Sequence, residues 1–119
     1  MNKDLQRAVL FAKSDQIIMP RDHEDLPLSI DEEEGVVAWI AFESPELGRQ
    51  CQMIDPSQFQ WGQMNGLSYL KFLHERVEQG GQHLLVINPG SNRQIGMNNE
   101  AISEFLKWLE ENPNGLELF

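Results

Sequence analysis

The single thiol and the imidazoles are the side chains best suited to covalent chemistry in this chain. Cys51 is the only cysteine, and it could act as a nucleophile only beside a base such as His74 or His83. A reactive cysteine also needs a lowered pKa, supplied by a helix N-terminus or a neighbouring cation. Cys51 instead lies at the C-terminal end of a short helix predicted at 45–51, and this end of a helix disfavours a thiolate. The pattern therefore predicts no catalytic residues and a protein that is not an enzyme.

A four-residue turn offers a second kind of chemistry, ligand binding through backbone groups. An aliphatic strand leads into Asn88, Pro89, Gly90 and Ser91. Pro89 pre-sets φ at the first central turn position, and Gly90 supplies the positive φ that a type II turn needs at the second. The turn could bind a ligand through its N–H groups and the Asn88 and Ser91 side chains. We favour a turn kept for its shape, with Asn88 hydrogen-bonded to its own backbone. The turn is not a phosphate-binding loop, because the lysine and the spacing of that motif are missing.

The histidines and the acidic stretch do not follow a metal-binding pattern. His23, His74 and His83 have no zinc-type spacing with one another or with Cys51. The acidic residues between 21 and 35 lack the alternating aspartates and central glycine of a calcium loop. A solvated, exposed connection is therefore favoured over weak cation binding. We expect no metal site and no cofactor.

Charge and composition exclude several classes of partner. The 119 residues include 9 basic and 19 acidic side chains, a net charge of -10. Nucleic acids and anionic membrane surfaces are bound mainly through Lys and Arg, so neither is expected as a partner. The N-terminus has no secretory-signal pattern, and no apolar run approaches the roughly 18 residues of a membrane span. The lone cysteine fits a reducing compartment, so we expect a cytoplasmic protein. The chain length predicts a single domain over residues 1–119.

Hydrophobic periodicity predicts a mixture of helices and strands without strict alternation. The run VVAWIAF at 36–42 is apolar throughout, which is typical of a strand covered on both faces. The fold class is therefore predicted to be α+β, a small mixed β-sheet packed with about three to four helices. Helices are expected at 4–13, 45–51, 63–79 and from Asn98 or Asn99 onward; strands at 16–19 (ended by Pro20), at 36–42 and twice within 83–97; and loops at 21–35 and 55–62.

Aromatic residues outside the predicted core could form a partner-binding surface. Phe72 falls roughly opposite the leucine stripe of its predicted helix. Either another element covers it, for which the N-terminal helix is the favoured candidate, or it is exposed apolar surface of the kind that marks a partner site. Phe59 and Trp61 lie just upstream and would extend such a patch. The candidate partner-binding residues are Phe59, Trp61, Phe72, Asn88, Pro89, Gly90 and Ser91.

Two blocks of the sequence resemble the bacterial SseB N-terminal-domain family. The block AWIAFESPELGRQC at 38–51 is similar to a family strand that ends at a Ser-Pro corner, here Ser44-Pro45. The block LLVINPGSNRQIGMNNEAISEFL at 84–106 is similar to the family's aliphatic strand, Asn-Pro-Gly-Ser turn, short strand and helix. The resemblance implies an α+β fold and a secretion- or stress-associated role, and it implies no catalytic or cofactor-binding residues.

These observations favour a non-enzymatic protein-interaction module of SseB N-terminal type. Acidic surfaces steer encounters with basic partners, so a basic protein is the expected partner. An exposed edge strand or apolar patch would also allow a homodimer. Two alternatives stay open. One is a small-molecule binding or catalytic protein with its site beside Asn88–Ser91, which requires a concave pocket with convergent polar groups there. The other is an acidic inhibitor or immunity-type partner of a basic protein.

Overall fold

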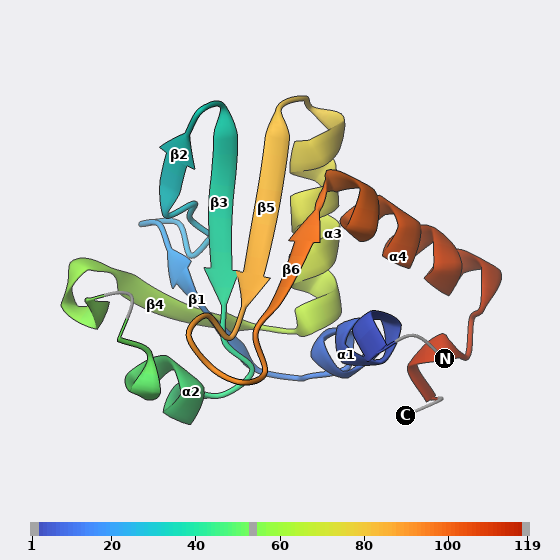
Figure 1. The fold of residues 1–119 in the computed structure, drawn as a ribbon, viewed down its shortest axis with the longest axis horizontal. Helices are drawn as coiled ribbons and strands as arrows, with labels where there is room; N and C mark the ends of the chain where they lie inside the picture. Colours follow the sequence, from blue (N-terminus) through green and yellow to red (C-terminus); the bar gives the residue numbers. More distant parts are fainter. Residues whose placement is uncertain (1–2, 53–54, 118–119) are drawn as a thin grey trace.

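The computed structural model describes residues 3–52 and 55–117 (Figure 1). Strands and helices are mixed in one domain, so the predicted α+β class is confirmed. In chain order the elements are α1 (Lys3–Ala12), β1 (Ile17–Arg21), β2 (Asp31–Glu33), β3 (Val36–Ala41), α2 (Pro45–Gln50), η1 (Pro56–Gln58), β4 (Gln60–Met64), α3 (Gly66–Glu78), β5 (Gln82–Ile87), β6 (Ile95–Asn98), α4 (Asn99–Glu111) and η2 (Gly115–Glu117).

The strands form two sheets that meet at the end of β3. The larger sheet has the order β2-β3-β5-β6, in which β3 and β5 are parallel and the outer pairs are antiparallel. The smaller sheet is the antiparallel ribbon β1-β4. Ile18 of the ribbon exchanges two backbone hydrogen bonds of 2.8 Å with Phe42, which directly follows β3. The ribbon is thereby anchored across the end of the larger sheet.

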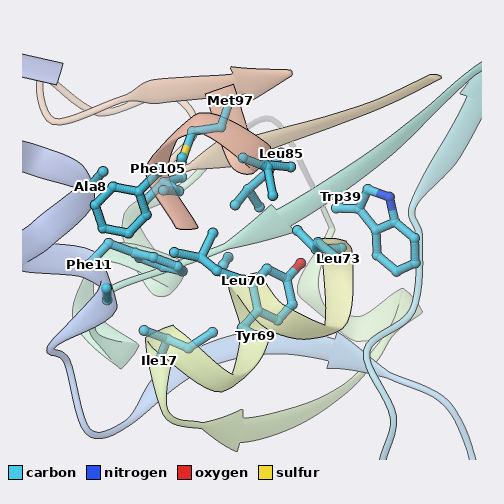
Figure 2. Close-up of a cluster of buried hydrophobic side chains, with 14 of the residues drawn as sticks. Ala8, Phe11, Ile17, Trp39, Tyr69, Leu70, Leu73, Leu85, Met97 and Phe105 are labelled. Atoms are coloured by element: carbon cyan, nitrogen blue, oxygen red, sulfur yellow. The ribbon is translucent and has the colours of Figure 1, made fainter. Parts of the chain in front are cut away.

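Helices α1, α3 and α4 cover one face of the larger sheet and enclose the core (Figures 1 and 2). Side chains alternate across a strand, and the odd-numbered positions of β3, β5 and β6 point to this face. Tyr69 of α3 is fully buried in the core, where its hydroxyl donates a hydrogen bond to the Ile40 carbonyl at 3.2 Å. Burial raises the pKa of Tyr69 far above its ordinary value. The buried core includes Ala8, Phe11, Ile17, Trp39, Tyr69, Leu70, Leu73, Leu85, Ile87, Met97, Ile102 and Phe105.

Local signals located three of the helix ends correctly, the starts of α2 and α4 and the end of α3. Ser44 caps α2, and its side chain accepts a hydrogen bond from the Leu47 N–H, with Pro45 in the first turn. Asn98 caps α4 in the same way through the Ala101 N–H. Helix α3 ends before Gly80 and Gly81, which both have positive φ. The two strands expected within 83–97 are β5 and β6.

The prediction was wrong over 55–64, where a loop and the start of a long helix were expected. Residues 60–64 form strand β4 instead, because pairing with β1 satisfies their backbone groups. Helix α3 starts only at Gly66, where the Asn65 side chain accepts the Ser68 N–H at 3.1 Å. Phe59 and Trp61 therefore flank or lie in a strand and not in an open loop.

Two other boundaries also differ from the prediction. Pro20 does not end β1. Its carbonyl accepts a hydrogen bond from the Leu28 N–H, so the backbone polar groups of this residue face away from β4. The N–H that proline lacks therefore removes no hydrogen bond to β4. The acidic connection 21–35 is not wholly a loop, since Asp31–Glu33 form β2 and pair with β3. Glu34 and Gly35, both with positive φ, make the two-residue hairpin turn that this pairing requires.

Gly66 is predicted to be essential for the contact between α1 and α3. Its N–H donates to the Ser14 carbonyl at 2.9 Å, and a methyl group at this position would overlap the Phe11 carbonyl oxygen. We expect Gly66→Ala to lower the free energy of unfolding by about 1–3 kcal/mol, measured by urea denaturation. Gly48→Ala is the matched control, because its methyl group would lie 3.5 Å from the Phe42 ring, an ordinary contact. Equal stability of the two variants would contradict the prediction.

Candidate functional site

Asn88 is a structural bridge between the ends of the parallel strands. Its side chain is 0% exposed. Its Oδ1 accepts the Glu43 N–H at 2.9 Å, and its Nδ2 donates to Glu43 Oε1 at 2.6 Å. Its own N–H donates to the Ala41 carbonyl at 2.8 Å. The expected bond of Asn88 to its own backbone is therefore wrong: the amide joins the segment after β5 to the segment after β3.

The other turn residues also use their polar groups within the loop. Gly90 has φ +80°, as a type II turn requires, and its N–H donates to Gln94 Oε1 at 2.8 Å. Ser91 Oγ donates to the Asn88 carbonyl and accepts the Arg93 N–H. Pro89 is buried. The hollow beside the turn, about 270 Å³, is lined by residues outside it, namely Arg7, Leu10, Glu43 and Arg93.

The three aromatic residues proposed as one patch lie in two separate groups. Trp61 contacts Phe59 and Phe42, with ring centroids 6.1 and 5.9 Å apart. Phe72 packs against the main core, edge-to-face on Trp39 at 5.9 Å, and the Arg76 guanidinium lies 4.8 Å from its ring. Phe72 is thus half-buried, so other elements cover it in part, and the sheet supplies one of its contacts through Trp39.

The thiol and the imidazoles have separate environments. Cys51 caps the C-terminal end of α2, as predicted, and is half-buried. His83 is buried between strands and helix: its Nδ1 accepts the Trp39 Nε1–H at 3.1 Å, and its Nε2 lies 3.1 Å from the Gly80 carbonyl oxygen. His74 Nε2 lies 3.7 Å from the Glu78 carboxylate on α3. Both imidazoles therefore interact with groups other than the thiol.

The acidic stretch after β1 is held by one of its own carboxylates. Asp22 Oδ1 accepts the N–H groups of Leu26 and Glu24 at 3.0 and 2.8 Å. These two hydrogen bonds lower the pKa of Asp22, and the bond from Leu26 has the larger effect. Arg21 contacts Asp25 at 3.1 Å. Across residues 3–52 and 55–117, no three His, Cys, Asp or Glu side chains are grouped as a metal ion would require.

The sheet face opposite the helices is apolar, and the expectation that 36–42 is covered on both faces is confirmed only for its second half. Residues 39–42 are buried, whereas residues 36–38 are half-buried. Figure 1 shows no helix in front of β3 and β5. We call this the open face; its apolar residues are Val36, Ala38, Ile40, Leu84 and Val86, the even-numbered positions of the two strands. Leu84 is 36% exposed, whereas Ile40 is 2% exposed. A hollow of about 370 Å³ lies over one end of this face, with Val36, Leu84, Asn98 and Glu100 in its lining.

Sequence reasoning missed Leu84 and Val86 as surface residues, because their residue types predict burial. The segments 36–42 and 84–87 are apolar at both odd and even positions, a pattern of strands buried on two sides. The helices supply cover for only one side. The mismatch between a two-sided pattern and one-sided cover is what marks the open face.

Comparisons with known proteins give no family to which the chain can be assigned. No protein-family model, curated protein or solved structure matches it. In the part of the chain that the structure describes, no helix has the length and apolar character needed to cross a bilayer.

Replacing Asn88 tests its role as a bridge. We expect Asn88→Ala to lower the free energy of unfolding by about 2–4 kcal/mol, because the Glu43 N–H and carboxylate lose their partners and alanine at φ +53° is strained. Asn92→Ala, an exposed position in the same loop, should change it by less than about 0.5 kcal/mol. Chemical denaturation measures both, and equal values would exclude the bridging role.

The isosteric variant Asn88→Asp adds a test with a defined pH dependence. At neutral pH it places a second carboxylate against Glu43 Oε1 and removes the donor. Folding then favours proton uptake by this pair, so the variant should lose stability as pH rises and approach the wild type below about pH 4. Parallel pH dependence of the variant and the wild type would contradict this.

The bonding of His83 also predicts its tautomer. Because the Trp39 indole can only donate, Nδ1 must accept, and the proton of the neutral ring must reside on Nε2. Long-range ¹H–¹⁵N NMR at pH 8 should show His83 as the Nε2–H tautomer, and Trp39→Phe should relax this preference. A protonated Nδ1 in the wild type would show that the Trp39 bond does not form.

Proposed function

We propose that this protein is a non-enzymatic interaction module that binds another protein through the open face of its larger sheet. The observation that supports this most strongly is that Leu84 and Val86 lie on a sheet face with no covering helix. Exposing such residues costs free energy that burial against a partner recovers. The hollow at one end of the face gives a partner a concave surface to fill.

The charges near the open face favour a basic protein over a second copy. Glu33 pairs with Val36 and so points to this face, Glu34 is in the adjoining hairpin turn, and Glu100 is in the lining of the hollow. The net charge of -10 makes two copies repel each other. A partner with Lys or Arg around an apolar centre would be complementary to this rim. A homodimer remains an outcome of the test.

The rest of the proposal follows from the sequence. The resemblance to the SseB N-terminal-domain family supports a secretion- or stress-associated role, and the lone cysteine supports a cytoplasmic location. An inhibitor or immunity-type role would use the same acidic rim. A small-molecule site at Asn88–Ser91 has less support, because the side chain of Asn88 is buried and the turn's polar groups bond within the protein.

Site-specific crosslinking tests the open face directly. A photoreactive benzoylphenylalanine at position 84 should crosslink in its native cell to a protein of basic isoelectric point, identified by mass spectrometry. The same group at Glu111, exposed on α4, is the control and should not yield this product. Loss of the product with Glu33→Lys and Glu100→Lys would support charge complementarity. A product consisting only of a second copy would replace the basic partner with a homodimer, and no product from position 84 would refute the proposal.

A further inference from the structure

A second surface, on a different side of the molecule, is a groove along the outer edge of β6. It has a volume of about 400 Å³ and lies between α1 and α4. Its lining is mainly apolar, with Ala8, Met97, Phe105 and Trp108 among its residues. Trp108 stacks on Phe105 with their centroids 6.1 Å apart, which gives the groove a rigid aromatic wall. Two carboxylates, Asp4 and Glu104, also line it.

The edge of β6 directs unpaired backbone groups toward this groove. The N–H and C=O groups of successive strand residues point to alternate sides. The Asn88 N–H donates to Ala41 of β3, so Ile87 faces β6 and forms a hydrogen-bonded pair with Ile95. The next residue of β6, Gly96, then points its N–H and C=O away from β5. Gly96 is exposed, and no described strand lies beyond β6.

We propose that this groove binds an extended, basic segment of a partner protein, which pairs with β6 as an additional strand. The segment's backbone would exchange hydrogen bonds with Gly96, an apolar side chain would enter the groove against Met97 and Phe105, and flanking Lys or Arg would lie near Glu104. A segment bound as a helix would leave the Gly96 groups unpaired, so the strand is the favoured conformation. The proposal rests on the function proposed above, since it names the type of segment the partner presents, but its site is separate from the open face.

The experiment uses the full chain and a synthetic peptide, acetyl-Lys-Thr-Val-Thr-Lys-amide. In an extended peptide the valine and both lysines share one side, so they face the groove when a threonine pairs with Gly96. We expect ¹⁵N-labelled protein to show saturable shifts of the Gly96 amide and the Trp108 indole. The acidic peptide acetyl-Glu-Thr-Val-Thr-Glu-amide should bind at least about fivefold more weakly at low salt.

Gly96→Pro removes the edge donor and should leave the β5-β6 pairing intact, because the Gly96 N–H faces away from β5. It should weaken peptide binding about fivefold to tenfold. Gly96→Ala, which keeps the N–H and whose methyl group meets Leu84 at an ordinary 3.8 Å, is the control and should bind as the wild type does. Glu104→Gln should weaken binding about twofold to fivefold, and Glu111→Gln should not.

A second arm does not depend on how well the proline variant folds. The same peptide methylated at both threonine amides cannot donate to β6, and it should bind wild-type protein at least about fivefold more weakly. Unchanged binding of this methylated peptide, or shifts confined to Leu84 and Val86, would overturn the groove proposal while leaving the open face in place. Absence of a crosslink from position 84, together with peptide binding at Gly96, would refute the open-face proposal and leave the groove proposal in place.

Discussion

The parallel pairing of β3 with β5 is the constraint on which the rest of this structure depends. Parallel neighbours need a crossover connection, and here that crossover contains α2, β4 and α3. Its middle strand pairs with β1, and its last helix supplies Tyr69, Leu70 and Leu73 to the core. The two parallel strands end beside each other, and the buried Asn88 amide joins the segments that leave them through Glu43. The position of the turn, of β6 and of α4 follows from this junction.

Features encoded by a few adjacent residues could be predicted from the sequence, whereas features that depend on distant partners could not. The Ser44 and Asn98 caps and the glycine pair after α3 are local signals, and the structure has them where expected. Strand β4 was missed because Gln60–Met64 has no strand periodicity of its own and becomes a strand through β1. The Asn88 bond was missed for the same reason: Glu43 is 45 residues away in the chain.

The candidate surfaces could not be predicted from the sequence for a different reason. The segments 36–42 and 84–87 do show from the sequence that both sides of these strands are apolar. They cannot show how many layers cover the sheet, because that depends on where α1, α3 and α4 pack. All three pack on the side of Trp39 and Leu85, so Leu84 and Val86 are left on the other. The groove beside β6 likewise exists only because α1 and α4, from opposite ends of the chain, approach the same edge.

The use of polar side chains is the reason for proposing surface presentation over catalysis. Among the described residues, every buried side-chain nitrogen and oxygen has a hydrogen-bond partner. His83, Asn88 and Ser91, which could each have served a reaction or a ligand, bond instead to Trp39, Glu43 and the turn backbone. A catalytic group must keep a lone pair or proton available to substrate, and these groups are committed to the fold. What the domain leaves unsatisfied is of another kind: apolar strand surface, an unpaired strand edge and an excess of carboxylates. Each of these is satisfied by a protein surface more readily than by a small molecule.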